Sequence, residues 1–153
     1  MILTNEIIKS SYFCLNKTNL LIKGMEGIKT DYGKMEAEIK DELITKYISS
    51  FKQRDSKIVS DIKIPCGELH SFSIATNVSL TSNYWNITFD AIEIDKENLI
   101  PTYFSSHSII EKYEKEYISC LAFILSTEIR ADIKVCKIVY EKESKIRTQK
   151  VNV

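Results

Sequence analysis

The sequence predicts an α/β fold, a single domain with a mixed β-sheet flanked by helices. Three observations predict it. The first third of the chain has helical periodicity, the middle alternates as strands do, and a second helical stretch separates two further strand regions. A helix between two strands is typical of a crossover that joins parallel strands. We assign residues 1–153 to one domain, with a helical arm over about 4–54 and the sheet with its packed helix over about 57–153.

The helical arm is predicted to hold two helices. Thr4 or Asn5 can cap the first, because either side chain accepts hydrogen bonds from free N–H groups one turn on. The apolar positions of this helix are Ile7, Ile8, Tyr12 and Leu15. Gly24 and Gly27 end the helical pattern, and Thr30 or Asp31 caps a longer helix over residues 31–54. One stripe of this second helix carries Met35, Ile39, Leu43, Tyr47 and Phe51.

The middle of the chain is predicted to form the sheet. Residues 57–64 alternate loosely, and residues 69–74 suit a half-buried strand. Tyr84–Ile94 is rich in aromatic and β-branched residues and predicts a strong strand. A short polar turn separates it from Leu99–Phe104, and the short turn predicts antiparallel pairing of the two. Pro101 lacks an N–H group, which indicates an edge position or an irregularity.

The last third of the chain predicts a helix and a closing hairpin. Ser106 or Ser108 can cap a helix from about Ile109 to Ile129, whose broad apolar face should cover the sheet. Residues 134–140 and 145–153 then form the hairpin.

Composition limits the function. Lys+Arg and Asp+Glu are 21 each, so the chain has no overall positive charge that would indicate a nucleic-acid partner. A local basic patch is compatible with this balance. The widely spaced cysteines form no Cys-x-x-Cys pair and are expected to be reduced; they are Cys14, Cys66, Cys120 and Cys136. The sequence has no apolar run of membrane-spanning length and no signal pattern at its start. We therefore expect a cytoplasmic protein without a membrane partner.

One acid stands out as a candidate site residue. Asp90 closes the run Trp85–Phe89, and a second strand follows after the turn. Many metal-dependent nucleases hold their ion on an acid placed in this way, and they also need an acid and a lysine two residues apart on the second strand.

Several stretches together carry a family resemblance. They are Cys14, Lys17, Leu20 and Gly24 followed by Asp31-Tyr32, then "FDAIEI", "LIPTYFSSHSIIEKYEKEYISCLAFILS" and "KIVYEKESKIRTQKVNV". Their order and spacing resemble the RecB-like nuclease domains of the PD-(D/E)XK superfamily, in the branch found alone, beside CRISPR systems or fused to helicases. The resemblance implies a restriction-endonuclease-like core, DNA as a partner, and a possible helicase or nuclease partner protein.

The resemblance assigns Asp90 to the metal-binding aspartate, which would hold Mg²⁺ or Mn²⁺ in an active deoxyribonuclease. Ile100 and Thr102 occupy the expected positions of the second acid and the lysine, and neither can perform those roles. The helix position that holds a metal-binding histidine in some relatives offers Glu36 or Glu38. The acid-x-lysine motif is therefore incomplete, which predicts weak or no cleavage and leaves open whether the protein is an enzyme.

Other charged residues are possible helpers of Asp90. They are Glu36, Glu93 and Lys96. On a regular strand Glu93 points to the opposite face from Asp90, because it lies an odd number of residues away. The alternative is that Asp90 is a lone strand-end acid followed by a polar turn.

Cys14 matches the first ligand of an iron–sulfur cluster in several relatives, where the other ligands follow in a cysteine-rich tail. This chain ends at Val153 before such a tail, so we expect no cluster in it. The chain is then either a natural short form or the front part of a longer protein. His70 and His107 have no partner at ligand spacing and are expected to be structural or exposed.

Two function classes remain. One is a RecB-like nuclease-fold domain that binds or acts on DNA with a degraded site. The alternative is a non-catalytic interaction module that docks on a helicase or nuclease.

Overall fold

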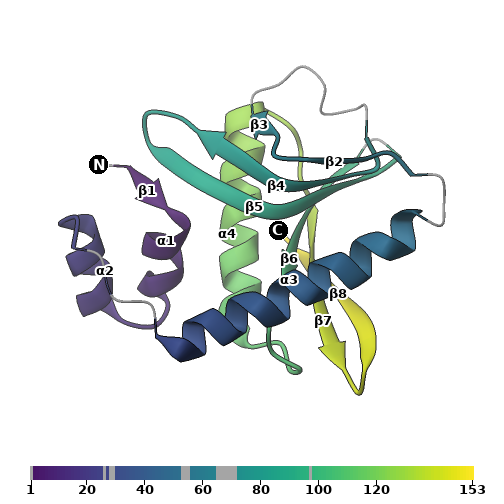
Figure 1. Ribbon diagram of the computed structural model, residues 1–153. Helices are drawn as coiled ribbons and strands as arrows, with labels where there is room; N and C mark the ends of the chain where they lie inside the picture. The colour runs from purple at the N-terminus through teal and green to yellow at the C-terminus, as the bar shows by residue number, and fades with distance from the viewer. Residues whose placement is uncertain (1, 26, 28–29, 53–55, 65–71, 97) are drawn as a thin grey trace.

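Over the residues that it describes, the computed structural model contains an eight-stranded mixed sheet and four helices, which confirms the predicted α/β class (Figure 1). The structure describes residues 2–25, 27, 30–52, 56–64, 72–96 and 98–153. The helices are α1 (Asn5–Ser11), α2 (Leu15–Ile22), α3 (Asp31–Lys52) and α4 (Lys112–Ile129). The strands are β1 (Leu3–Thr4), β2 (Ile58–Ser60), β3 (Lys63–Ile64), β4 (Ile74–Thr81), β5 (Trp85–Asp95), β6 (Asn98–Phe104), β7 (Val135–Lys142) and β8 (Lys145–Asn152).

The strand order is β2-β4-β5-β6-β7-β8, with β1 beside β5 and β3 beside β4. The predicted antiparallel pairing of β5 with β6 is confirmed, with Ile94 opposite Leu99. Helix α4 then carries the chain to β7, which pairs parallel to β6, and the closing hairpin β7–β8 is antiparallel as predicted. Both kinds of pairing therefore occur in one sheet.

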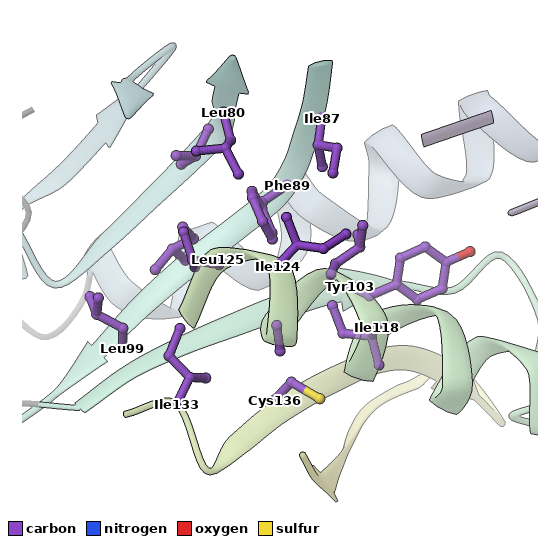
Figure 2. Packing of buried hydrophobic residues seen from close by; sticks show 14 of the residues in the cluster. Leu80, Ile87, Phe89, Leu99, Tyr103, Ile118, Ile124, Leu125, Ile133 and Cys136 are labelled. Carbon is purple, nitrogen blue, oxygen red and sulfur yellow. The ribbon is translucent and has the colours of Figure 1, made fainter. Parts of the chain in front are cut away.

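The two faces of the sheet are buried by different helices. Phe89, Ile92 and Ile138 belong to the larger core cluster, which α4 closes with Ile118 and Leu125. Figure 2 shows side chains of this cluster, among them Phe89 of β5 and Leu125 of α4, gathered between the strands and the helix. On the other face, α3 packs Leu43 and Tyr47 against Ile74, Ala91, Phe104 and Val139. Burial of this apolar area is the main force that holds the two helices to the sheet.

The helical arm differs from the prediction in one respect. The Thr4 cap is confirmed, since its hydroxyl accepts the Ile7 N–H at 3.4 Å. The prediction of one continuous first helix was wrong, because the extended backbone of Cys14 separates α1 from α2. The turn lets the Ser10 and Thr18 hydroxyls meet at 3.0 Å, so α2 folds back on α1. Figure 1 shows this pair at one side of the sheet.

The predicted stripe of α3 is buried only over its second half. Leu43 is 2% exposed, whereas Met35 is 48% and Ile39 is 41% exposed. The apolar stripe in the sequence could not show this difference in burial. The first half of α3 runs past the sheet toward the helical arm (Figure 1). No described helix has the length and apolar character needed to span a membrane.

The side-chain alternation of the central hairpin is interrupted. In β5, Phe89 packs on the α4 face, whereas Ala91, two residues on, packs on the α3 face. In β4, Ala75 and Val78 lie three residues apart and share the α4 face, and Asn77 between them has a positive φ of 51°. A residue in the left-handed region shifts a strand out of its period of two. The chain therefore changes faces at this level of the sheet.

Three local expectations need correction. Of the predicted strand over residues 69–74, residues 69–71 lie outside the described part, and β4 begins only at Ile74. Helix α4 is capped by a reciprocal pair, Glu111 and Glu114, and not by Ser106 or Ser108. Strand β6 is internal, yet its ladder with β7 covers only Thr102–Phe104, so Pro101 lies just before that ladder begins.

Candidate functional site

Asp90 lies within β5, where the strand changes faces, and not at its end as the sequence suggested. Its carboxylate is turned toward α3, and the side chain is 18% exposed. One oxygen, Oδ1, lies 2.7 Å from the Lys40 ammonium of α3. The other, Oδ2, accepts the backbone N–H of Phe104 in β6 at 3.0 Å. Both oxygens of the candidate metal ligand therefore already have a partner within the protein.

The residues around Asp90 do not fit a divalent cation. Mg²⁺ and Mn²⁺ need several oxygen ligands, and an ammonium group 2.7 Å from the carboxylate repels a cation. On β6, the α3 face presents Thr102 and Phe104, neither of which is an acid or a lysine. Among the described residues, no three His, Cys, Asp or Glu side chains are grouped in a way that could hold a metal ion.

Glu93 also faces α3, contrary to the expectation from regular alternation. The switch between Phe89 and Ala91 brings Glu93 to the same face as Asp90, so both acids contact α3. Lys40 and Tyr47, their partners on α3, lie seven residues apart, which is two helical turns. The structure therefore places the two acids in one row beneath α3, each with a different partner.

Glu93 forms a buried network. It is 6% exposed, and its Oε1 accepts the Tyr47 hydroxyl at 3.0 Å and the Thr102 hydroxyl at 2.9 Å. Its Oε2 forms an ion pair with the Lys137 ammonium from β7. Lys137 also donates to the Tyr47 hydroxyl at 3.3 Å. A carboxylate paired in this way holds the helix to the sheet, and both of its oxygens already have partners within the protein.

Glu36 contacts the loop before α4. Its Oε1 lies 3.4 Å from the Ser106 hydroxyl and 3.4 Å from Nε2 of His107. The other ring nitrogen of His107 lies 3.3 Å from the fully buried Glu114. His107 therefore bridges two carboxylates, a structural role that its sequence spacing left open.

Lys96 is not brought to Asp90. It follows the last residue of β5 with a positive φ of 61°. At the rise of a strand, their separation of six residues along the chain corresponds to roughly 20 Å. The positive charge beside Asp90 comes from Lys40 instead. Sequence reasoning missed Lys40 and Lys137, because both reach their acids across the fold from distant segments.

The described cysteines are spread over separate elements. Cys14 is exposed at the start of α2, Cys120 is half-buried on α4, and Cys136 is buried in β7. Burial raises the pKa of the Cys136 thiol to about 11, so it remains protonated at neutral pH. Cys66 and His70 lie outside the described residues. The expected lack of an iron–sulfur cluster stays a prediction.

The β7–β8 hairpin gathers positive charge. Residues 134–153 contain six Lys or Arg and two Glu, which gives a local net charge of +4 in a chain that is neutral as a whole. The cations that this hairpin exposes to solvent include Lys142, Lys145, Arg147 and Lys150. Strand β8 is the last strand of the sheet order, so no further strand of the described residues pairs with this edge of the hairpin. Such a local patch attracts phosphate groups.

Comparisons with known proteins add little. No protein-family model matches the chain, and no curated protein matches its sequence. A solved structure described as the crystal structure of SSO0001 superposes with a TM-score of 0.49 at 15% sequence identity, over 99% of this chain and 67% of that chain. A superposition this loose carries no argument about activity.

Proposed function

We propose that this protein is a DNA-binding domain with a RecB-like nuclease core that binds DNA without cleaving it. The observation that carries the proposal is the state of Asp90. Its two carboxylate oxygens are engaged by Lys40 and by the Phe104 N–H, so the residue that the resemblance assigns to the metal serves the fold. The basic β7–β8 hairpin supports contact with phosphate groups.

The loss of cleavage follows from electrostatics. A phosphodiester needs stabilisation of the charge that develops on it, and losing one preorganised contact of this kind commonly costs ~100-fold or more in rate. Here the acid-x-lysine pair of the second strand is missing, because Ile100 and Thr102 occupy its expected positions. We expect no cleavage of single-stranded or double-stranded DNA with Mg²⁺ or Mn²⁺.

The test compares the wild type with Asp90→Asn at equal protein concentration and with equal folding verified. The expected result is background cleavage in both proteins. Metal-dependent cleavage that disappears in Asp90→Asn would reinstate the nuclease. Asp90→Asn and Lys40→Met should each lower the free energy of unfolding by roughly 1 kcal/mol, and the two changes should be non-additive, because they break the same ion pair.

DNA binding is tested at the hairpin. Replacing Arg147 and Lys150 by Gln should weaken binding to any DNA sequence and reduce the slope of log affinity against log salt by about 2. Lys112→Gln is the matched control, because that lysine is exposed on α4, outside the hairpin. Equal affinities of the hairpin variant and the control would contradict the proposed DNA contact.

A second candidate function is docking on a helicase or nuclease partner. The observation that favours it is an apolar groove of about 460 Å³ between the helical arm and α4, which includes Ile8, Trp85 and Phe123. Phe123 is 65% exposed, so its ring is accessible to a partner at this groove. If docking is the function, DNA affinity is absent or insensitive to the hairpin charges, so the hairpin experiment separates the two candidates.

A further inference from the structure

A second cleft lies apart from the Asp90 ion pair. It has a volume of about 760 Å³ and is formed by α1, α2, the start of α3 and the residues around the start of α4. This volume lies within the range of clefts that hold small ligands or side chains of a partner. Acidic and aromatic residues line one half of this cleft, whereas the β7–β8 hairpin is basic.

Aromatic rings line the cleft. Phe13 and Tyr113 meet edge to face, with ring centroids 4.2 Å apart. Phe13 is 56% exposed and Tyr32 is 59% exposed, so their rings are accessible to a ligand. Exposed rings gathered around a cleft provide the electron-rich faces to which organic cations bind.

The charge at the Tyr113 end of the cleft is negative. Burial raises the pKa of the Tyr113 phenol, and the nearby carboxylates of Glu114, Glu36 and Glu111 raise it further. The cation-forming group at this end is His107, which lies between Glu36 and Glu114. The lysines that line the cleft are Lys9 on α1 and Lys17 on α2, and Lys17 already pairs with Glu6.

We propose that the Tyr113 end of this cleft binds an organic cation, an ammonium or guanidinium group. Tyr32 and Tyr113 supply ring faces, and Glu36 and Glu111 supply opposite charge. The cation belongs either to a free amine or to a lysine or arginine side chain of a protein partner. A phosphate group is disfavoured here, because the carboxylates repel it. The site is therefore independent of the proposed DNA contact and goes beyond it.

The test is calorimetric titration of the full chain with three probes. The first is agmatine, which carries a guanidinium and an ammonium group. The second is a short acetylated peptide with one arginine, and the third is the same peptide with neutral citrulline in its place. We expect agmatine, the arginine peptide or both to bind in the millimolar range or better, and the citrulline peptide to bind at least about tenfold more weakly.

Two variants locate the binding. Tyr32→Ala and Glu36→Gln should each reduce the affinity about threefold or more, because each removes one attractive contact. Tyr84→Ala and Glu143→Gln are the matched controls, since Tyr84 is 67% exposed and Glu143 lies in the β7–β8 turn, both outside the lining of the cleft. Circular dichroism of each variant checks that the fold is kept.

Each outcome bears on the proposal. Binding of agmatine alone identifies a small amine as the source of the cation, and binding of the arginine peptide alone identifies a protein side chain. The proposal is overturned if neither cationic probe binds at millimolar concentration, if citrulline binds as well as arginine, or if Tyr32→Ala and Glu36→Gln bind like their controls.

Discussion

Asp90 and Glu93 have the same functional group and different environments, and their partners decide what each does. Asp90 is partly open to solvent and shares its charge between Lys40 and a backbone N–H. Glu93 is buried and depends on Lys137 and two hydroxyl groups. A buried carboxylate is tolerated only when it is paired and hydrogen-bonded in this way. The role of both acids is therefore to stabilise the packing between α3 and the sheet.

The Glu93–Lys137 pair makes a prediction at this scale. Glu93→Gln or Lys137→Met should lower the free energy of unfolding by about 3 kcal/mol, because either change leaves an unpaired charge in a buried place. Urea unfolding monitored by fluorescence measures the change. The double variant should lose less than the sum of the two single losses.

Lys46→Met is the control for that measurement. Lys46 pairs with Glu141 at 2.9 Å, but their side chains are 51% and 36% exposed. Such a surface pair contributes little, so the loss should stay within about 1 kcal/mol. Equal losses in the buried and exposed pairs would show that burial does not determine the contribution of Glu93.

The sequence located the candidate acid but not its partners. Asp90 is conspicuous because it follows a run of β-forming residues. Lys40 is 50 residues away along the chain, and Lys137 is 44 residues from Glu93. Nothing in local periodicity connects such segments, because the register of distant strands and helices is set by packing of the whole core.

At the scale of elements, long periodic segments were predictable and their ends were not. Helix α4 and the strands β5 and β6 form from strong patterns, and the structure has them. Serine residues before α4 suggested a hydroxyl cap, yet Glu111 takes that place because Glu114 completes the reciprocal capping box. The face of Glu93 was missed because the alternation of β5 is interrupted between Phe89 and Ala91, which the sequence pattern does not show.

The cap of α4 supplies the second prediction. Glu114 is fully buried, and it accepts the Glu111 N–H at 2.8 Å and the Ser105 hydroxyl at 2.5 Å. Glu114→Ala should lower the free energy of unfolding by about 2 kcal/mol, because both donors lose their partner. Glu116→Ala is the control on the same helix, with an expected change within about 0.5 kcal/mol. Thermal or urea unfolding measures both changes. Equal losses in Glu114→Ala and Glu116→Ala would contradict the role of the cap.

At the scale of the molecule, a net charge of zero conceals a separation of charge. The β7–β8 hairpin is positive, and the Tyr113 end of the cleft is negative. The composition of the whole chain excludes only a large overall charge. The positive hairpin and the negative end of the cleft arise from the way the chain folds. The two proposed binding surfaces therefore select ligands of opposite sign, phosphate groups at the hairpin and organic cations at the cleft.

The last prediction concerns the pH dependence of the whole fold. Burial raises the pKa of Tyr103 and of Tyr117 above the ordinary value for tyrosine, and the charge of Asp90 adds to both shifts. Below a pH of about 10 both the folded and the unfolded chain keep these protons, so the two buried tyrosines contribute their full share to the free energy of unfolding. Above it the unfolded chain releases protons that the folded chain retains. The free energy of unfolding should then fall by up to about 1.4 kcal/mol per pH unit for each tyrosine.

Urea unfolding at a series of alkaline pH values measures this slope. Tyr103→Phe should make the decline shallower, because phenylalanine has no proton to release. Tyr117→Phe should do the same and should also cost about 1 kcal/mol at every pH, since the Tyr117 hydroxyl accepts a hydrogen bond from Asn5 at 2.8 Å. Tyr84→Phe is the control, because an exposed phenol has nearly the same surroundings in both states. A decline of the same steepness in all four proteins would mean that other groups govern alkaline unfolding.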